Sequence, residues 1–526
     1  MRKPAGNPSG KLIDIDFMSV GRLVLAALFM VAIYLFMQIN PAGTGVDSTL
    51  LVVAAVIGGY MALNIGANDV ANNVGPAVGA GAVTLLGAIL IAVVFEAGGA
   101  IIAGGDVVKT IKKGIIDPAM IPDTQTFIWV MTAALLSAAI WLNIATYSGA
   151  PVSTTHSIVG GVLGAGIAAG GWSIADWGQV QKIVASWVIS PALGGIIAAS
   201  FLLLIKQTVL RKDDKKAAAL QYVPILMGIM AWAFTTYIIL KGIKKIVKVE
   251  FPIALGIGFA GAVLVYIIVR VIITKRAEKI RNTRKGIDRL FTIPLIVGAA
   301  FLSFAHGAND VANAVGPLAA INEAIRGGDI ATKAAIPLWV MMIGALGIAV
   351  GLALYGPKLI KTVGNEITEL DKVRAFCVAL AAAITVIIAS QMGLPVSSTH
   401  IAVGGIFGVG FLREHLNTNY NHKIDKIRRH MREEEEKDEA TIDAFIEKFN
   451  SAKVAEKREI LVELKRKARR EEITWWERRR VKKAFKAQLV ERSMLLKIIA
   501  AWIFTVPVAG LLSAALFFML RGIMLP

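Results

Sequence analysis

The chain contains a single cysteine, Cys377, so disulfide bonds take no part in its structure. Charged residues are also scarce: they make up 18% of the 526 residues, against about 25% in soluble domains. Apolar residues make up 56%, and the mean hydropathy is +0.65. This composition excludes a soluble globular class and predicts a protein that crosses a membrane many times.

The start of the chain has no pattern of a cleavable signal peptide, because residues 1–17 are too polar before the first apolar run. We therefore expect residues 21–39 to be a retained first span. The net charge of +19 could suggest binding to nucleic acid. The Lys and Arg residues, however, lie in short loops between apolar segments and in one long insert, which is typical of cytoplasmic loops. Nucleic acid is therefore not an expected partner.

Apolar stretches long enough to cross a lipid bilayer recur along the chain, since about 20 residues suffice. Two further segments, 151–170 and 395–412, are shorter and rich in glycine, and either broken spans or re-entrant hairpins would account for them. The clear spans and these two segments together predict about 10 to 13 membrane segments. The clear spans are predicted at 21–39, 50–67, 80–104, 128–148, 183–205, 222–243, 251–274, 291–308, 337–356, 373–392 and 494–520.

Two sequence motifs each occur twice. GANDVANNVGP at 66–76 returns as GANDVANAVGP at 307–317, and PVSTTHSIVGG at 151–161 returns as PVSSTHIAVGG at 395–405. The order is the same in both halves. This duplication predicts that two halves of the chain converge on one site.

The charges that follow the second motif predict the relative orientation of the halves. Residues 170–181 carry few cations, whereas residues 413–493 are dense in Lys and Arg and are expected in the cytoplasm with the N-terminus. Equivalent positions then lie on opposite sides of the membrane, which favours an inverted-topology repeat. A further similarity, between 185–200 and 500–515, supports the same alignment. We predict an all-α polytopic protein with broken or re-entrant helices, in the cell (inner) membrane.

The predicted organisation has six parts. These are an N-terminal segment with an extra span (1–49), a first transport repeat (50–205), connecting spans with basic cytoplasmic loops (206–290), a second transport repeat (291–412), a charged helical cytoplasmic insert (413–493) and the final span (494–526).

Asp69 and Asp310 lie at the ends of apolar spans, where a charged carboxylate costs about 2.5–3.5 kcal/mol. A bound cation, a polar partner or an aqueous cavity would offset that cost. Asn68 and Asn72 share a helix face near Asp69, so carboxylate and amide oxygens can gather around one point. Such oxygens suit a hard cation such as Na⁺, and Asn313 is the equivalent of Asn72 in the second copy.

The other motif has complementary chemistry. Pro151 and Pro395 are expected at first helical positions, with hydroxyl side chains in the first turn. Hydroxyls beside free N–H groups at a helix N-terminus form an anion site. Two such ends that meet near the middle of the membrane could hold a tetrahedral oxyanion. The residues concerned are Ser153, Thr154 and Thr155 in the first copy and Ser397, Ser398 and Thr399 in the second.

Three further polar residues lie in apolar surroundings. We predict that His156 and His400 orient neighbouring groups through hydrogen bonds, with direct contact to the substrate or a role in proton coupling as the alternatives. Glu96 has no evident counterpart in the second half, and either a role in binding the coupling ion or a buried hydrogen bond would explain it.

These motifs, with TIKKGII at 110–116, resemble the inorganic phosphate transporter (PiT) family over essentially the whole chain except the first span and the 413–493 insert. The resemblance implies a homodimeric, inverted-repeat importer of inorganic phosphate in the lipid bilayer, with Na⁺ and H⁺ both open as driving ion. In this chain the largest loop lies before the final span, so ideas about a central regulatory loop are not transferred. Carried over, the resemblance points to Asn68, Asp69, Asn309 and Asp310 around cations and phosphate, and to Ser153, Thr154, Thr155, Ser397, Ser398 and Thr399 around the anion.

The sequence therefore predicts a secondary transporter, not an enzyme, which imports phosphate by alternating access without a cofactor. A sulfate permease of the same fold is the alternative, and hydrogen phosphate is favoured because it can donate a proton to a carboxylate. An anion channel is remote, and so is an intramembrane hydrolase, which would need one working constellation of Ser, His and Asp and not two. The predicted coupling-ion residues are Asn68, Asp69, Asn72, Glu96, Asn309, Asp310 and Asn313.

Overall fold

Helices form almost all of the structure. In a bilayer interior no water is present to bond backbone groups, and helices satisfy these groups within one segment. Among the described residues, the one β-bridge joins Ile116 and Ala175. The computed structural model describes residues 17–39, 46–148, 152–242, 249–327, 336–365, 370–416 and 492–524.

Eleven helical segments of the described residues are long and apolar enough to cross a membrane. Each predicted span coincides with one of them. The first half contains α1 (Phe17–Ile39), α2 (Val46–Asn68), α3 (Val70–Gly79), α4 (Leu85–Ala103), α5 (Gly105–Lys113), η1 (Pro118–Met120), α6 (Thr124–Ser148), α7 (Thr154–Gly170), η2 (Trp172–Ile174) and α8 (Trp177–Ile205). The remainder contains η3 (Lys206–Leu210), α9 (Lys215–Lys241), α10 (Phe251–Glu278), α11 (Arg284–Leu290), α12 (Thr292–Asp310), α13 (Ala312–Gly327), α14 (Leu338–Asn365), α15 (Lys372–Gln391), α16 (Ser398–Leu416) and α21 (Arg492–Met524).

Both GANDVAN motifs interrupt a long helix. The first break separates α2 from α3 at Asp69, and the second separates α12 from α13 at Val311. Each motif continues to a proline inside the following helix, Pro76 and Pro317, whose ring removes one backbone donor from the helix. The prediction of broken helices is confirmed.

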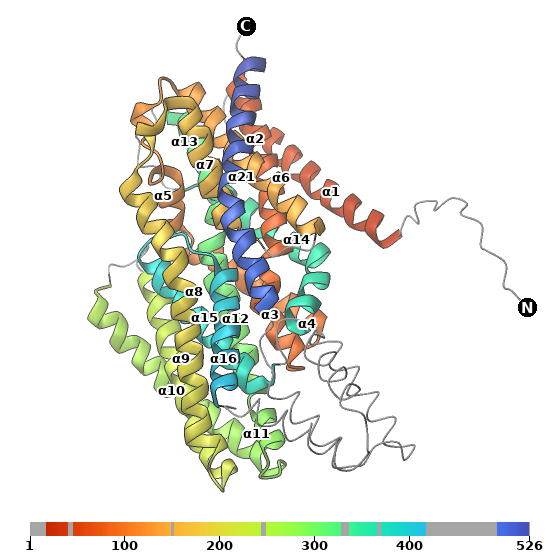
Figure 1. Ribbon diagram of the computed structural model, residues 1–526, viewed down its shortest axis with the longest axis vertical. Coiled ribbons are helices and arrows are strands. Elements are labelled where there is room, and N and C mark those ends of the chain that lie inside the picture. Colours follow the sequence, from red (N-terminus) through yellow and green to blue (C-terminus); the bar gives the residue numbers. More distant parts are fainter. Residues whose placement is uncertain are drawn as a thin grey trace, which may run out of the picture.

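The two PVS motifs each begin the second helix of a hairpin. α6 packs against α7, and α15 packs against α16. Figure 1 shows α6 and α7 in the upper half of the molecule and α15 and α16 in the lower half. The hairpins therefore approach the centre from opposite ends, as the inverted-topology repeat predicts.

The two repeats are intertwined. α2 packs against α14, and its counterpart α12 packs against α4; likewise α7 packs against α21 and α16 against α8. Glycine allows the closest approaches, because a Cβ atom at Gly66 would lie 1.9 Å from the Ile348 carbonyl oxygen and one at Gly307 would lie 2.1 Å from that of Glu96. Since the two glycines are equivalent, Ile348 and Glu96 are structural counterparts.

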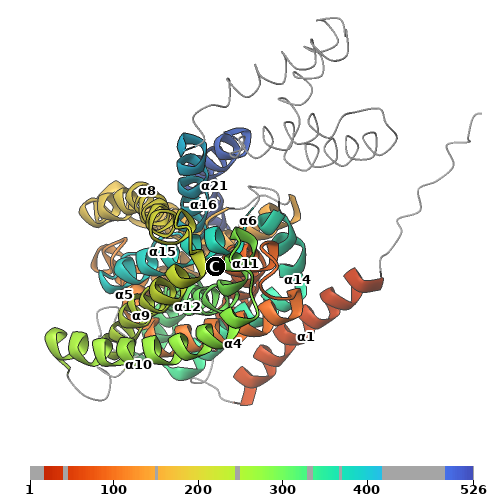
Figure 2. The same cartoon turned by 90° about the horizontal axis from the view of Figure 1, so that it is seen from below.

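Figure 2 places α12 near the middle of the helices and α1, α8 and α10 at the periphery. This agrees with the burial of the second motif, because Thr292–Arg326 is among the most buried of the candidate spans. The predicted insert 413–493 lies outside the described residues, apart from its first four residues in α16 and its last two in α21. The N-terminal residues 1–16 lie outside them as well.

Candidate functional site

All of the predicted site residues are buried, and each exposes 4% or less of its surface. The helix breaks explain how the acidic residues reach the interior. Asp69 lies between α2 and α3, and Asp310 is the last residue of α12. Both carboxylates therefore lie where backbone hydrogen bonding is interrupted.

Serine hydroxyls cap the two helices that face these carboxylates. Ser153 Oγ accepts a hydrogen bond from the His156 N–H at 3.1 Å, and Ser397 Oγ accepts one from the His400 N–H at 3.3 Å. A serine at the N-cap is a favoured helix start. The prediction of Pro395 at the first helical position is wrong: it lies two residues before the Ser397 cap. Pro151, its equivalent, lies outside the described residues.

Each aspartate is bonded to a hydroxyl of its own repeat. Thr154 Oγ1 donates to Asp69 Oδ2 at 2.7 Å, and Ser398 Oγ donates to Asp310 Oδ2 at 2.9 Å. Thr154 and Ser398 occupy equivalent positions, so the two contacts are related by the repeat symmetry. In each half, the hydroxyl residue that follows the PVS serine thus binds the carboxylate of the same half.

The second asparagine of each GANDVAN motif instead contacts the other repeat. Asn72 Nδ2 donates to Thr399 Oγ1 at 2.8 Å, and Asn313 Nδ2 donates to Thr155 Oγ1 at 3.2 Å. Thr399 also donates to Asp69 Oδ1 at 3.0 Å. The duplicated motifs therefore meet in one network that contains side chains from both halves.

Several oxygen atoms of this network have no hydrogen-bond donor within the described part of the chain. The amide nitrogens of the same asparagines are bonded, so the surplus consists of acceptors alone. A buried acceptor without a donor is costly, and a cation can take the place of the donor. These atoms are Oδ1 of Asn72, Asn73, Asn309, Asn313 and Asp310.

Glu96 lies at the edge of the network and pairs with a residue that the sequence analysis did not single out. Glu96 Oε2 lies 2.5 Å from His306 Nδ1, and Glu96 Oε1 accepts a hydrogen bond from Asn73 at 2.8 Å. His306 Nε2 lies 2.9 Å from Asp310 Oδ2. One signal could have revealed His306: it precedes the second GANDVAN motif where the first copy has Ile65.

Asp69, His306 and Asp310 form a compact group of possible metal ligands. One ligand atom from each lies within 4.8 Å of the others, and all three residues are buried. The two carboxylates with the amide oxygens around them suit a hard cation such as Na⁺, whose preferred ligands are oxygens.

The remaining asparagines lie at the rim of the network. Asn309 Nδ2 donates to Ser390 Oγ at 3.0 Å and to the Leu394 carbonyl at 3.3 Å. Asn68, with its amide oriented to satisfy its neighbours, accepts from Thr146 Oγ1 at 3.0 Å and donates to Asp69 Oδ1 at 3.3 Å. Asn68 is thus bonded to the central carboxylate of Asp69, and Asn309 is bonded to residues near the end of α15.

The two motif histidines make ring contacts where hydrogen bonds were predicted. The ring nitrogens of His400 have no hydrogen-bond partner among the described residues, whereas the His156 ring has a polar contact with the backbone of Trp502. The His156 ring lies 3.8 Å from that of Trp187, the His400 ring lies 3.5 Å from that of Trp502, and the two imidazoles meet edge to face at 4.5 Å. Ring contacts, tilted for His156 and stacked for His400, therefore hold these imidazoles in place.

Comparison with known proteins agrees with this arrangement. The model of the phosphate transporter family matches residues 65–513. A provisionally named phosphate permease of Helicobacter pylori strain J99 is 51% identical over 511 residues, which cover 94% of each chain. Another from Pyrococcus furiosus is 42% identical over 364 residues, 69% of this chain and 88% of the relative.

A solved structure is similar as well. A sodium-dependent phosphate transporter superposes with a TM-score of 0.73 and 30% identity, covering 90% of this chain and 100% of that chain. Its coverage includes both repeats. The chain therefore belongs to the phosphate transporter family, and it is a multi-pass membrane transporter and not an enzyme.

Proposed function

We propose that the protein is a Na⁺-coupled symporter that imports inorganic phosphate by alternating access. The observation that carries the choice of ion is the set of buried amide and carboxylate oxygens without donors around Asp69 and Asp310. Such oxygens attract a cation that takes only oxygen ligands. A proton could satisfy one oxygen at a time, whereas Na⁺ binds several together. The sodium dependence of the similar solved transporter supports the same choice.

The starts of α7 and α16 are the proposed phosphate site. Unpaired N–H groups and the positive end of each helix dipole favour an anion there, and both first turns carry hydroxyl side chains. Hydrogen phosphate can donate its proton to a neighbouring carboxylate, and sulfate has none to donate. The proximity of Asp69 to Thr154 and of Asp310 to Ser398 therefore favours phosphate over sulfate.

In the proposed cycle, cations first neutralise Asp69 and Asp310. The oxyanion then binds at the two helix starts, and the repeats rock to expose the site to the other side. The order follows from charge, because a dianion is repelled by two uncompensated carboxylates at short range.

Uptake of radiolabelled phosphate into proteoliposomes tests this proposal, with imposed Na⁺ or H⁺ gradients and excess unlabelled sulfate as competitor. Accumulation driven by the Na⁺ gradient and unaffected by sulfate is the expected result. Accumulation with an H⁺ gradient alone would show that H⁺, and not Na⁺, is the coupling ion. Suppression by sulfate would favour sulfate as the substrate. Absence of accumulation under both gradients would overturn coupling.

We further propose that the protein forms a homodimer in the cell (inner) membrane, with its N-terminus and the 413–493 insert in the cytoplasm. Its lone cysteine, Cys377, is fully buried, so introduced cysteines can be labelled selectively. Lys212→Cys should react with a membrane-impermeant maleimide only after permeabilisation, and Trp172→Cys should react in intact cells. The reverse pattern would invert the topology. Light scattering in detergent measures the number of chains.

A further inference from the structure

A cavity of about 730 Å³ lies beside α5, away from the central network. It is lined by the ends of α4 and α9, by α5, by the start of α14 and by Gln391 at the end of α15. Lys241, the last residue of α9, lies one helix length away from Lys215 and the basic segment before it. The cavity, here called the α5–α9 pocket, is therefore at the opposite end of α9 from the basic segment 206–216.

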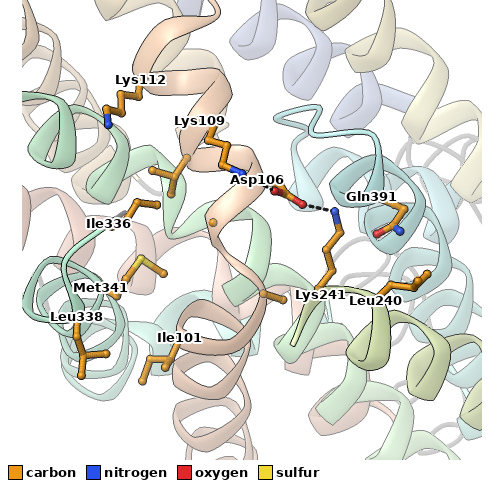
Figure 3. A pocket seen from close by; sticks show the side chains of 13 residues that line it. Ile101, Asp106, Lys109, Lys112, Leu240, Lys241, Ile336, Leu338, Met341 and Gln391 are labelled. Carbon is orange, nitrogen blue, oxygen red and sulfur yellow. Dashed lines mark hydrogen bonds and ion pairs between the residues drawn. The ribbon is translucent and has the colours of Figure 1, made fainter. Parts of the chain in front are cut away.

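The pocket carries more positive than negative charge. Its charged lining consists of Asp106, Lys109, Lys112 and Lys241. Lys112 forms an ion pair with the buried Glu323. Lys109 and Lys241 share the single carboxylate of Asp106, as Figure 3 shows.

The Lys241 side chain is the unusual member of this group. It is only 10% exposed, and within the described part of the chain Asp106 is its one ion-pair partner. Asp106 is 42% exposed and also contacts Lys109, whose side chain is 76% exposed. A nearly buried ammonium group that shares its counter-ion attracts a further anion.

One wall of the pocket belongs to the segment that leads to the phosphate site. Thr110 of α5 donates a hydrogen bond to the Gly393 carbonyl at 2.7 Å, and Gly393 has a φ of +68°, which favours glycine. Gln391 faces the pocket, while Leu394 accepts a hydrogen bond from Asn309 of the central network. The pocket and the site thus lie on either side of residues 391–394.

We propose that the α5–α9 pocket is an outer binding site that captures inorganic phosphate before it passes residues 391–394. Lys241 and Lys109 bind the phosphate oxygens, and Asp106 competes with the anion for both ammonium groups. This inference rests on the proposed function, because it concerns the same substrate.

Initial rates of phosphate uptake into intact cells test the site, because only the outer face of the protein then meets the substrate. In a host that lacks its own phosphate importers, the variant with both Lys109→Gln and Lys241→Gln should raise the KM for phosphate at least about fivefold. The rate at saturating phosphate and the dependence on Na⁺ should stay unchanged. Asp106→Asn should lower the KM, because it removes the competing carboxylate.

Salt provides an independent readout. Raising the ionic strength with choline chloride should raise the KM of the wild type and have little effect on the double variant, because screening weakens the attraction of the lysines. Lys182→Gln is the matched control, since Lys182 is an exposed residue of α8 that does not line the pocket. Lys241→Arg keeps the charge and should keep the KM.

The outcomes separate this inference from the proposed function. If the wild type shows no phosphate uptake, both the proposed function and the outer binding site are overturned. If the wild type accumulates phosphate and the double variant retains the wild-type KM, only the outer site is overturned. A fall in the maximal rate without a change in KM, for a double variant that reaches the membrane and elutes as the wild type on gel filtration, would also overturn it.

Discussion

The Glu96 carboxylate and the His306 imidazole form a fully buried pair, 2.5 Å apart, at a place where the inverted repeat is not symmetric. The position equivalent to Glu96 is Ile348, as the close approaches at Gly307 and Gly66 show. The position equivalent to His306 is Ile65. The crossing of α4 with α12 thus holds a polar pair where the equivalent crossing of α14 with α2 holds two isoleucines.

Replacing both members of this pair should separate stability from transport. We expect His306→Ile alone to lower the free energy of unfolding by about 3–5 kcal/mol, because Glu96 is then left buried with only the Asn73 amide as partner, and Glu96→Ile alone to lower it less, because His306 keeps its contact with Asp310. The double variant should recover most of that loss, since an apolar pair replaces an ionic one. Thermal unfolding in detergent measures both effects.

The same double variant should lose phosphate uptake by at least about tenfold, a barrier change of about 1.4 kcal/mol. Glu96 also accepts from Asn73, and His306 faces Asp310, so both groups adjoin the proposed cation site. Wild-type uptake by a stable double variant would show that the pair has a purely structural role.

Neutralising either aspartate should nearly abolish transport while the protein still reaches the membrane. Asp69→Asn and Asp310→Asn each remove a charge that a bound cation requires, and we expect uptake to fall by at least about a hundredfold. Asp117→Asn, the same change at an exposed residue, should leave uptake intact. Full activity in Asp69→Asn or Asp310→Asn would remove the carboxylates from the mechanism.

The glycines at the repeat interface should not tolerate a methyl group. Gly66→Ala would place Cβ 1.9 Å from a carbonyl oxygen, and overpacking of this kind costs about 1–3 kcal/mol. Gly256→Ala is the control, because Gly256 lies in α10 with no atom near its absent Cβ. That change should leave the melting temperature unchanged or raise it slightly. Equal melting temperatures for the two variants would contradict the close approach of α2 to α14.

Acid should weaken the start of α15 through Asp371. Burial raises the pKa of Asp371, but hydrogen bonds and the charge of Arg374 outweigh it and hold the pKa below its ordinary value. The contribution of Asp371 to stability is then present above the unfolded pKa of about 3.9 and is lost as the pH falls through the lower folded pKa.

We therefore expect wild type to melt at a higher temperature than Asp371→Asn at pH 6 and to lose that advantage progressively as the pH falls below the ordinary carboxyl pKa of about 3.9. Melting temperatures in detergent across this range, with Asp117→Asn as the reference substitution, provide the check. An advantage that persists unchanged into acid would contradict the role of the carboxylate as a cap and ion-pair partner.

The spans were predictable from apolar runs, and the convergence of the motifs was predictable from their duplication in the sequence. Each span is a long apolar run, and the breaks follow from Gly and Pro beside Asp69 and its equivalent. The duplication placed Thr154 and Ser398 in matching roles, which the structure repeats in their bonds to the two aspartates.

The partners across the repeats could not be predicted, because they depend on how distant helices cross. Asn72 and Thr399 are 327 residues apart, and Glu96 and His306 are 210 apart. The ring contact between His156 and Trp187 is likewise a product of packing between α7 and α8. Periodicity and spacing describe one helix at a time and carry no information about these contacts.

The isoleucines at the positions equivalent to Glu96 and His306 affect the relative energies of the conformations of the unloaded protein. With two identical repeats, the inward-open and outward-open forms would be related by symmetry and equal in energy. A polar pair at the α4–α12 crossing and two isoleucines at the α14–α2 crossing remove that equality. In the proposed alternating-access cycle, we therefore expect the unloaded protein to favour opening to one side of the membrane, and the residues at these four positions to help set which side it is.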